Sequence, residues 1–215
     1  VGGGKYNYAA GTQATVSGGV SNTVSADFSA VSGGRGNTGS STFAVIGGGW
    51  INVVSGSAAA VVGGKSNTAQ NMYSAVGGGS SNLASGAYSV VSGGSTNVAS
   101  AHDTSVGGGY QNSALQIGST IGGGAYNRVL ANSSTVAGGL RNTVGDAASF
   151  GAIGGGVANT VIGAAAAVFA GTYNVASETY ATVAGGHFNT ASGKSSVVSG
   201  GLRNKVVSLS ASIGG

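Results

Sequence analysis

The segment VGGGSSNLASGAYS, residues 76–89, holds the pattern that decides the fold, because its asparagine recurs along the whole chain. Successive copies stand 15 residues apart, except for one step of 17 residues between Asn142 and Asn159. A repeat this short and regular predicts one structural unit that is stacked many times. The fourteen asparagines are Asn7, Asn22, Asn37, Asn52, Asn67, Asn82, Asn97, Asn112, Asn127, Asn142, Asn159, Asn174, Asn189 and Asn204.

Three further columns keep their residue type when the copies are aligned on this asparagine. Gly stands three residues earlier in every copy, and four residues earlier in every copy except the one with Ala170. Ala or Val stands two residues later, with Gly39 as the single exception. We expect these columns to be buried or conformationally restricted. The column six residues earlier is always Val or Ile: Val1, Val16, Val31, Ile46, Val61, Val76, Val91, Val106, Ile121, Val136, Ile153, Val168, Val183 and Val198.

These columns favour a β-solenoid over a helical repeat. Two glycines in every unit would each destabilise a helix by about 1 kcal/mol, and 15 residues are too few for the helix pairs of most α-solenoids. The β-branched stretch 88–92 is typical of a short strand. Gly-Gly-x-x-Asn is typical of a turn, in which Gly adopts positive φ and Asn accepts a hydrogen bond from its own backbone and tolerates the left-handed region.

We therefore predict an all-β chain of about fourteen coils of 15 residues each, with the asparagines stacked in a ladder. Residues 1–215 form a single repeat domain in this interpretation, and a bulged bend near Asp146 to Phe150 absorbs the two-residue insertion. One buried Val or Ile contributes about 1.5–3 kcal/mol, whereas ordering a coil costs about 15–30 kcal/mol. Burial against another chain would help to offset that cost, so we expect an oligomer.

Composition excludes several other classes of protein. Only 6% of the residues are charged, against about 25% in an average globular protein. The apolar stretch 164–170 is far shorter than the roughly 20 residues that a membrane-spanning helix needs, so we expect no membrane insertion. Pro and Cys are both absent, which excludes collagen and disulfide frameworks. No signal-peptide pattern is present, and we expect a mature piece or a fragment.

The unit at residues 76–89 resembles the head repeats of trimeric autotransporter adhesins of the YadA-like and ubiquitous-surface-protein-A type, whose pattern is similar to V-G-G-G-x-x-N-x-A-x-G-x-Y-S. The resemblance covers nearly the whole chain. It implies a left-handed parallel β-roll, three chains packed side by side as a homotrimer, and display on a bacterial surface. The later Gly of the pattern is replaced in many copies, so we expect an irregular second turn. Replacements include Ala26, Ser41, Asn71, Ala101, Gln116 and Ala131.

Charged and aromatic residues follow the repeat in two sets. Seven of the eight cations lie within two positions of a ladder asparagine, whereas Asp27, Asp103, Asp146 and Glu178 lie four to six positions after it, with Lys194. We therefore expect one basic edge and one acidic edge. Either the charges stand where side chains reach water, or the basic edge engages an anionic partner such as a sulfated glycan. The candidate ligand contacts are Lys5, Tyr6, Arg35, Trp50, Lys65, Tyr110, Tyr126, Arg141, Tyr173, His187 and Arg203. We expect the aromatic column six residues after the asparagine to pack between coils or chains.

No residue set predicts catalysis, a cofactor or a metal. His102 and Asp103 are neighbours, and strand neighbours point to opposite sides, so we expect a solvated pair and no catalytic dyad. Gly64-Lys65-Ser66 matches only the end of a phosphate-binding loop, because the earlier glycine is replaced by Ala59. Two histidines and four scattered carboxylates give no plausible ligand set for a metal. The cations are too few and too dispersed to predict nucleic-acid binding.

The sequence thus predicts a non-enzymatic, extracellular β-roll head of a trimeric surface fibre that binds host or matrix proteins or glycans through several copies of its edges. Two alternatives share the same fold: the shaft of a phage tail fibre, located on a virion, and a subunit of a self-assembling extracellular filament. A third alternative is ice binding, because threonine recurs directly after the asparagine. That column also holds Tyr8, Leu83 and Arg128, so it does not form a regular array.

Overall fold

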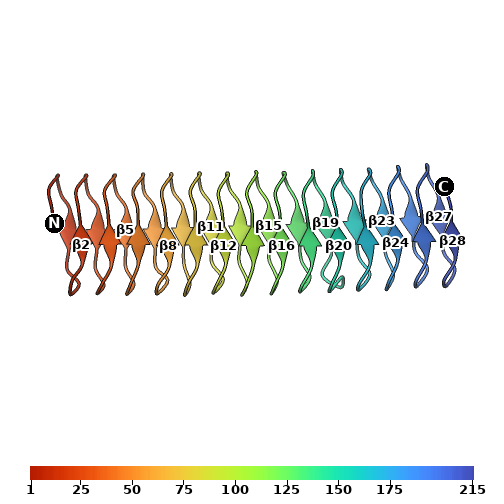
Figure 1. Ribbon diagram of the computed structural model, residues 1–215, viewed down its shortest axis with the longest axis horizontal. Helices are drawn as coiled ribbons and strands as arrows, with labels where there is room; N and C mark the ends of the chain where they lie inside the picture. Colours follow the sequence, from red (N-terminus) through yellow and green to blue (C-terminus); the bar gives the residue numbers. More distant parts are fainter. The chain divides into compact units, whose positions relative to one another are not determined.

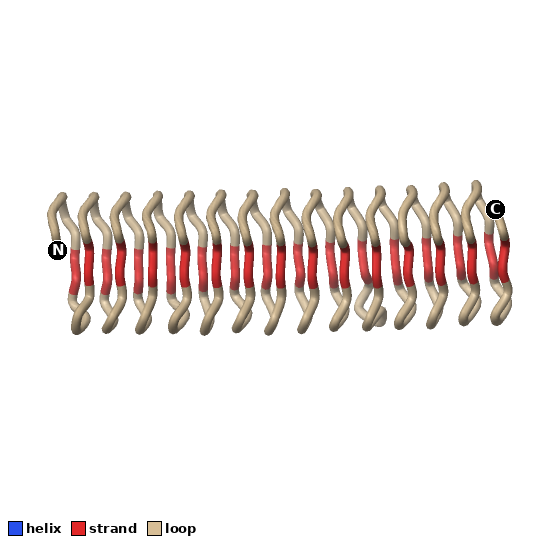
Figure 2. The backbone as a smooth tube through the Cα atoms, in the orientation of Figure 1, coloured by secondary structure: helices blue, strands red, loops and turns tan.

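The computed structural model describes residues 1–215, and it comprises two compact units, Val1–Gly109 and Tyr110–Gly215. Its regular secondary structure consists of two-residue β-strands joined by turns and bends, without a helix. Figure 2 shows the strands in pairs, with a loop at each end of every coil. The prediction of an all-β solenoid is therefore confirmed, and no helix in the structure has the length and apolarity needed to cross a membrane.

Each coil contributes one odd-numbered and one even-numbered strand. In the first unit the odd-numbered strands are β1 (Tyr8–Ala9), β3 (Thr23–Val24), β5 (Thr38–Gly39), β7 (Val53–Val54), β9 (Thr68–Ala69), β11 (Leu83–Ala84) and β13 (Val98–Ala99). The even-numbered strands are β2 (Thr15–Val16), β4 (Ala30–Val31), β6 (Val45–Ile46), β8 (Ala60–Val61), β10 (Ala75–Val76), β12 (Val90–Val91) and β14 (Ser105–Val106).

The second unit repeats this arrangement. Its odd-numbered strands are β15 (Ser113–Ala114), β17 (Arg128–Val129), β19 (Thr143–Val144), β21 (Thr160–Val161), β23 (Val175–Ala176), β25 (Thr190–Ala191) and β27 (Lys205–Val206). Its even-numbered strands are β16 (Thr120–Ile121), β18 (Thr135–Val136), β20 (Ala152–Ile153), β22 (Ala167–Val168), β24 (Thr182–Val183), β26 (Val197–Val198) and β28 (Ser212–Ile213).

Strands of one parity pair in parallel with their counterparts in the next coil, so that each unit contains two sheets. In the first unit Thr23 of β3 pairs with Tyr8 of β1 and with Thr38 of β5, an offset of one repeat in each direction. Within each unit, successive coils lie side by side (Figure 1), and the register places equivalent residues next to one another. The sequence predicted the even-numbered strands; the odd-numbered ones begin directly after the ladder asparagine.

The core of each unit lies between its two sheets. The Val/Ile column belongs to the even-numbered strands, and the Ala/Val column belongs to the odd-numbered strands. Val31 and Ile46 from the first column, and Val24 and Val54 from the second, have no exposed surface. Because side chains alternate along a strand, the other residue of each strand faces outward. The predicted burial of both columns is confirmed in the interior coils.

The asparagine ladder is also confirmed, and its hydrogen bonds join neighbouring coils. Asn52 donates from Nδ2 to the carbonyl oxygens of Gly48, in its own turn, and Gly64, in the next coil, both at 2.9 Å. Its Oδ1 accepts the backbone N–H of Asn67 at 2.9 Å. The side chain thus bonds its own turn as a donor, and not as the expected acceptor, and it also bonds the adjacent coil.

The left-handed residues of the glycine turn differ from the prediction. The turn that precedes each odd-numbered strand is here named the glycine-turn edge. Its second glycine has positive φ, as at Gly79 (+85°), where a β-carbon would collide with the carbonyl oxygen of Gly94. The second left-handed position is the residue before the asparagine, such as Ser81 (φ 56°), and not the asparagine itself.

The opposite turn, which joins each odd-numbered strand to the next even-numbered one, is here named the second-turn edge. The expectation that it is irregular was wrong for its backbone. In the coils without the two-residue insertion, the residue six positions after the asparagine has positive φ whatever its side chain, as at Phe43 (60°), Ala58 (53°) and Tyr73 (55°). Side-chain hydroxyl groups close several of these turns; Ser89, for example, donates to the carbonyl oxygen of Gly86 at 2.7 Å.

The two-residue insertion lies in this second turn, as predicted, and Figure 2 shows a wider loop there. Ser134 binds the enlarged turn at two points: its hydroxyl donates to the carbonyl oxygen of Ala148 at 2.9 Å and accepts the N–H of Gly151 at 3.0 Å. β18 and β20 still pair with Val136 opposite Ile153. The insertion therefore changes the loop and leaves the register of the sheets intact.

Candidate functional site

The glycine-turn edge of the first unit holds its candidate contact residues in fixed positions. Parallel bridges join Lys5 to Val20, Val20 to Arg35, Arg35 to Trp50 and Trp50 to Lys65. The backbone N–H of Trp50 also donates to Gly64 at 2.8 Å, as that of Arg35 does to Gly49 at 2.9 Å. Backbone bonds between adjacent coils thus arrange these exposed side chains in a row along the edge.

Two lysines on this edge lie over aromatic rings. The Nζ atom of Lys65 is 4.4 Å from the centre of the Trp50 ring, and that of Lys5 is 4.7 Å from the centre of the Tyr6 ring. Both distances are within the range of a cation–π interaction, which contributes about 0.5–1 kcal/mol at exposed sites. These contacts keep the ammonium groups close to the edge while they remain accessible to solvent.

The same edge of the second unit carries two aromatic clusters. In one, Tyr110 and Tyr126 meet edge to face at 5.3 Å, with the guanidinium of Arg141 5.8 Å from the Tyr126 ring centre. In the other, Tyr173 stacks on Phe188 at 4.8 Å, His187 contacts Phe188 at 4.4 Å, and Arg203 lies 5.9 Å from the Phe188 ring centre. Phe188 is central to this cluster, although it was not among the candidate contacts. Its position directly before Asn189, like that of Tyr173 before Asn174, was the available signal.

The structure separates the cations near the asparagine ladder into two groups that the sequence analysis did not distinguish. Lys5, Arg35, Lys65, Arg141 and Arg203 lie in the turn itself, whereas Arg128 and Lys205 are the outward-facing residues of β17 and β27. The expected basic edge therefore comprises the turn residues, and Arg128 and Lys205 belong to the neighbouring sheet face.

The four carboxylates lie on the second-turn edge, as expected. Asp27 accepts the backbone N–H of Thr12 at 2.6 Å, and Asp146 accepts that of Ala147 at 2.9 Å. Asp103 is hydrogen-bonded to His102, with 2.7 Å between Oδ2 and Nδ1. No carboxylate thus neutralises the cations of the glycine-turn edge.

The contact between His102 and Asp103 corrects one step of the sequence argument. These residues lie in a turn, where Asp103 has a φ of 57°, and their side chains meet instead of pointing apart. Both remain more than half exposed, at 52% and 59%, so the expected solvation of the pair holds. The structure shows no nucleophile hydrogen-bonded to His102, whose ring contacts that of Tyr88 at a tilt of 53°, with 5.2 Å between ring centres.

Aromatic residues on the second-turn edge stack between coils. Phe28 and Phe43 have ring centres 5.2 Å apart, and Tyr73 and Tyr88 have theirs 5.1 Å apart. Ala58 stands between the two pairs, and the rings that border it are the more exposed members, with 54% for Phe43 against 46% for Phe28. The expectation for this column was packing between coils or between chains, and the two stacks show packing between coils.

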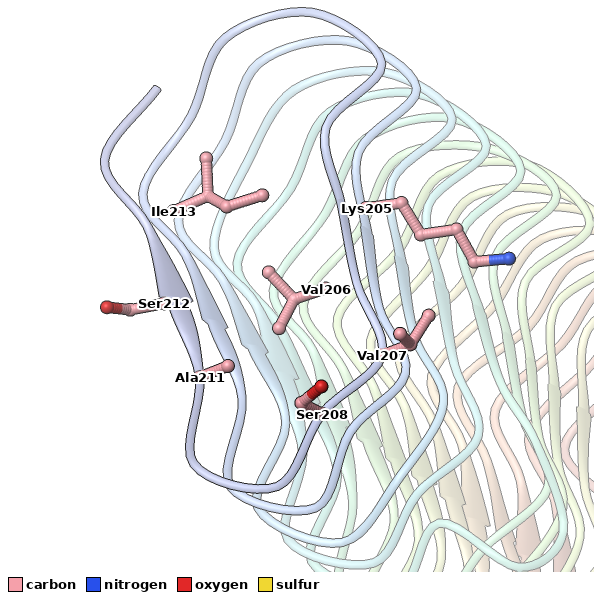
Figure 3. A pocket seen from close by; sticks show the side chains of 7 residues that line it. All are labelled: Lys205, Val206, Val207, Ser208, Ala211, Ser212 and Ile213. Atoms are coloured by element: carbon pink, nitrogen blue, oxygen red, sulfur yellow. The ribbon is translucent and has the colours of Figure 1, made fainter.

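A hollow of about 220 Å³ lies at the last coil of the second unit. Figure 3 shows that Val206 and Ile213 point into it, whereas Lys205 points away. Val206 and Ile213 occupy the columns that form the core in the other coils, so the hollow is an uncovered part of the core. No group of three or more His, Cys, Asp or Glu side chains is placed to hold a metal ion.

Comparison of the chain with models of known protein families gives no match, and comparison with curated proteins gives none either.

Proposed function

We propose that this chain is the β-roll head of an extracellular, homotrimeric surface fibre, which binds host or matrix ligands through several copies of its glycine-turn edge. The support comes from the parallel solenoid, from the accessible basic and aromatic edge, and from the resemblance of the repeat to adhesin heads. A left-handed coil and location on a bacterial surface belong to this proposal.

The observation that carries the proposal is the uncharged outer face of the even-numbered sheet in each unit. Such a face can pack against another copy of the chain without leaving a buried, unpaired charge. Its outward residues are only Thr, Ala, Val and Ser: Thr15, Ala30, Val45, Ala60, Ala75, Val90 and Ser105 in the first unit, and Thr120, Thr135, Ala152, Ala167, Thr182, Val197 and Ser212 in the second.

Trimer formation would give the edge its function. Three copies on one rigid particle raise the effective concentration of each weak contact, and avidity can then exceed the affinity of a single edge by about 10²–10⁴. This mode of binding needs no deep pocket along the edge, because each contact needs only an exposed cation or ring.

Light scattering of the isolated protein tests the proposal. One chain has a mass of 20.1 kDa, and we expect a species of about three times that mass. The double variant Val45→Lys, Ala75→Lys places charges on the even-numbered sheet and is expected to yield monomers. Its matched control, Thr38→Lys with Thr68→Lys on the odd-numbered sheet, is expected to remain trimeric.

A wild-type protein that stays at the mass of one chain at all concentrations would overturn the trimer. Dissociation of the control alone would overturn the choice of face.

Beads that carry the trimer should adhere to a matrix-coated surface more strongly than beads with an equal amount of the monomeric variant, and equal adhesion would contradict multivalent binding.

A further inference from the structure

We propose that Lys5, Arg35 and Lys65, together with Trp50, form a binding site for a linear sulfated polysaccharide that lies along the glycine-turn edge of the first unit. These four residues are here named the cation row. The inference rests on the proposed adhesive function and specifies the ligand class of the same edge.

The cation row follows from the register of the coils. The bridges run from Lys5 through Val20 to Arg35 and through Trp50 to Lys65, so a cation stands on every second coil. Because hydrogen-bonded strands lie about 4.8 Å apart, neighbouring cations arise from backbone positions about 10 Å apart, and the row spans about 19 Å. A row of evenly spaced positive charges suits a polymer whose negative charges also recur along one line.

The electrostatic environment of the row also favours an anion. No ion pair or hydrogen bond engages the ammonium of Lys5 or Lys65 or the guanidinium of Arg35. The carboxylates of the unit, Asp27 and Asp103, lie on the opposite edge. The positive potential of this edge is therefore not cancelled locally, and it attracts polyanions from solution.

The aromatic rings hold two of the lysine side chains in place, and each lysine in turn leaves less ring surface free for stacking. Trp50 and Tyr6 each have a lysine over one ring face, at 4.4 and 4.7 Å. This arrangement restricts the lysine side chains before a ligand arrives, which lowers the entropy lost on binding. Arg35 adds a planar group with paired N–H donors that match the oxygens of a tetrahedral anion.

These features favour a sulfated polysaccharide over a nucleic acid. Proteins that bind single-stranded nucleic acids stack bases on open aromatic faces, and proteins with strong phosphate-driven affinity for duplex DNA make about 6–10 phosphate contacts. The cation row offers three charges and the partly covered ring of Trp50. A sulfated polysaccharide needs only the spaced charges, and a trimer would present three rows.

Binding of the full chain to immobilised heparin, measured at 50 and 150 mM NaCl, tests the proposal. The triple variant Lys5→Gln, Arg35→Gln, Lys65→Gln should weaken binding at least tenfold at 50 mM and flatten its salt dependence, because fewer counterions are released. The matched control Arg128→Gln, Lys194→Gln, Lys205→Gln lowers the net charge equally but lies outside the row, and we expect less than a threefold effect. Trp50→Ala should weaken binding about two- to fivefold, because Lys65 loses its support.

Equal losses for the two triple variants would show that net charge alone drives retention and would overturn the site. Absence of wild-type binding at 50 mM NaCl would overturn it as well. A single-stranded oligothymidylate that binds as tightly as heparin, with the same dependence on the row, would overturn the choice of ligand class. Light scattering of every variant separates these outcomes from failure of the proposed function, because absence of heparin binding by an intact wild-type trimer contradicts only the ligand class.

Discussion

Replacing Asn52 by alanine removes one rung of the asparagine ladder in the middle of the first unit. The side chain is fully buried, and it makes three hydrogen bonds, to the carbonyl oxygens of Gly48 and Gly64 and from the N–H of Asn67. Gly64 keeps a second donor, the N–H of Trp50 at 2.8 Å, whereas the Asn67 N–H loses its side-chain acceptor.

The expected cost follows from this inventory of bonds. Each of the three hydrogen bonds contributes about 1 kcal/mol, and a buried donor left without a partner adds about 1–3 kcal/mol, so we expect the free energy of unfolding to fall by about 4–6 kcal/mol. For a chain of this length that loss corresponds to a decrease in Tm of roughly 8–24 °C. Thermal unfolding followed by circular dichroism measures it, and a decrease below about 2 °C would refute the role of the ladder.

The isosteric change Asn52→Asp gives the same position a dependence on pH. A carboxylate oxygen would replace Nδ2 and face the two carbonyl oxygens, so burial and repulsion would raise the pKa of the new carboxyl above its unfolded value of about 3.9. A raised pKa makes the contribution of the carboxyl most favourable below the unfolded pKa, and that contribution is lost as the pH rises through the folded pKa. The deficit in Tm relative to wild type should therefore be larger at pH 7 than at pH 3. The exposed control Asn132→Asp should show no such trend, and a deficit at position 52 that is equal at both pH values would contradict the reasoning.

Three further changes test other parts of the fold. Gly79→Val should cost more than about 3 kcal/mol, because its β-carbon would meet the carbonyl oxygen of Gly94 at a φ of +85°, whereas Gly63→Val, with open space around the β-carbon, should cost much less in the same melting experiment. Ala58→Tyr should join the two aromatic stacks of the second-turn edge and raise Tm by about 1–5 °C, since each new ring pair contributes about 0.5–1.5 kcal/mol and ordering the side chain offsets part of it; an equal rise for Ala58→Leu would show that stacking is not the cause. Deletion of Asp146 and Ala147 restores the 15-residue spacing, and a Tm within about 3 °C of wild type is expected, because the sheets on both sides already keep their register; a large decrease would mean that the insertion has a structural role.

The sequence predicted those features that the repeat forces on every coil. The columns headed by Val16 and Val24 are buried, and the glycine turn, the ladder and the site of the insertion were all predicted, because a residue type that recurs every 15 positions implies a common environment. The odd-numbered strands were missed because segments such as Leu83–Ala84 lack a β-branched run like that of residues 88–92, which marked an even-numbered strand.

Local conformation was harder to predict than the stacking. The regular backbone of the second turn was not predicted because its side chains vary. Hydrogen bonds to the neighbouring coil hold the backbone, so the left-handed position accepts Phe43, Ala58 and Tyr73 alike. The contact of His102 with Asp103 depends on that same turn, so the assumption of a strand misled the prediction. The role of Phe188 depends on side-chain packing between coils, which column alignment suggests but does not establish.

Equivalent residues of successive coils stack at a constant spacing. This is the central claim, since the ladder, both edges and the cation row all depend on it. Since the chain has no cysteine, spin labels attach only to the two cysteines that are introduced in each variant. Pulsed electron paramagnetic resonance on the pairs Ser32→Cys with Ser92→Cys and Ser17→Cys with Ser92→Cys, diluted with unlabelled chain, measures the two separations. Four and five coil spacings of about 4.8 Å predict backbone separations of about 19 and 24 Å. Label separations that do not increase with the number of intervening coils, or that greatly exceed these values, would contradict the account.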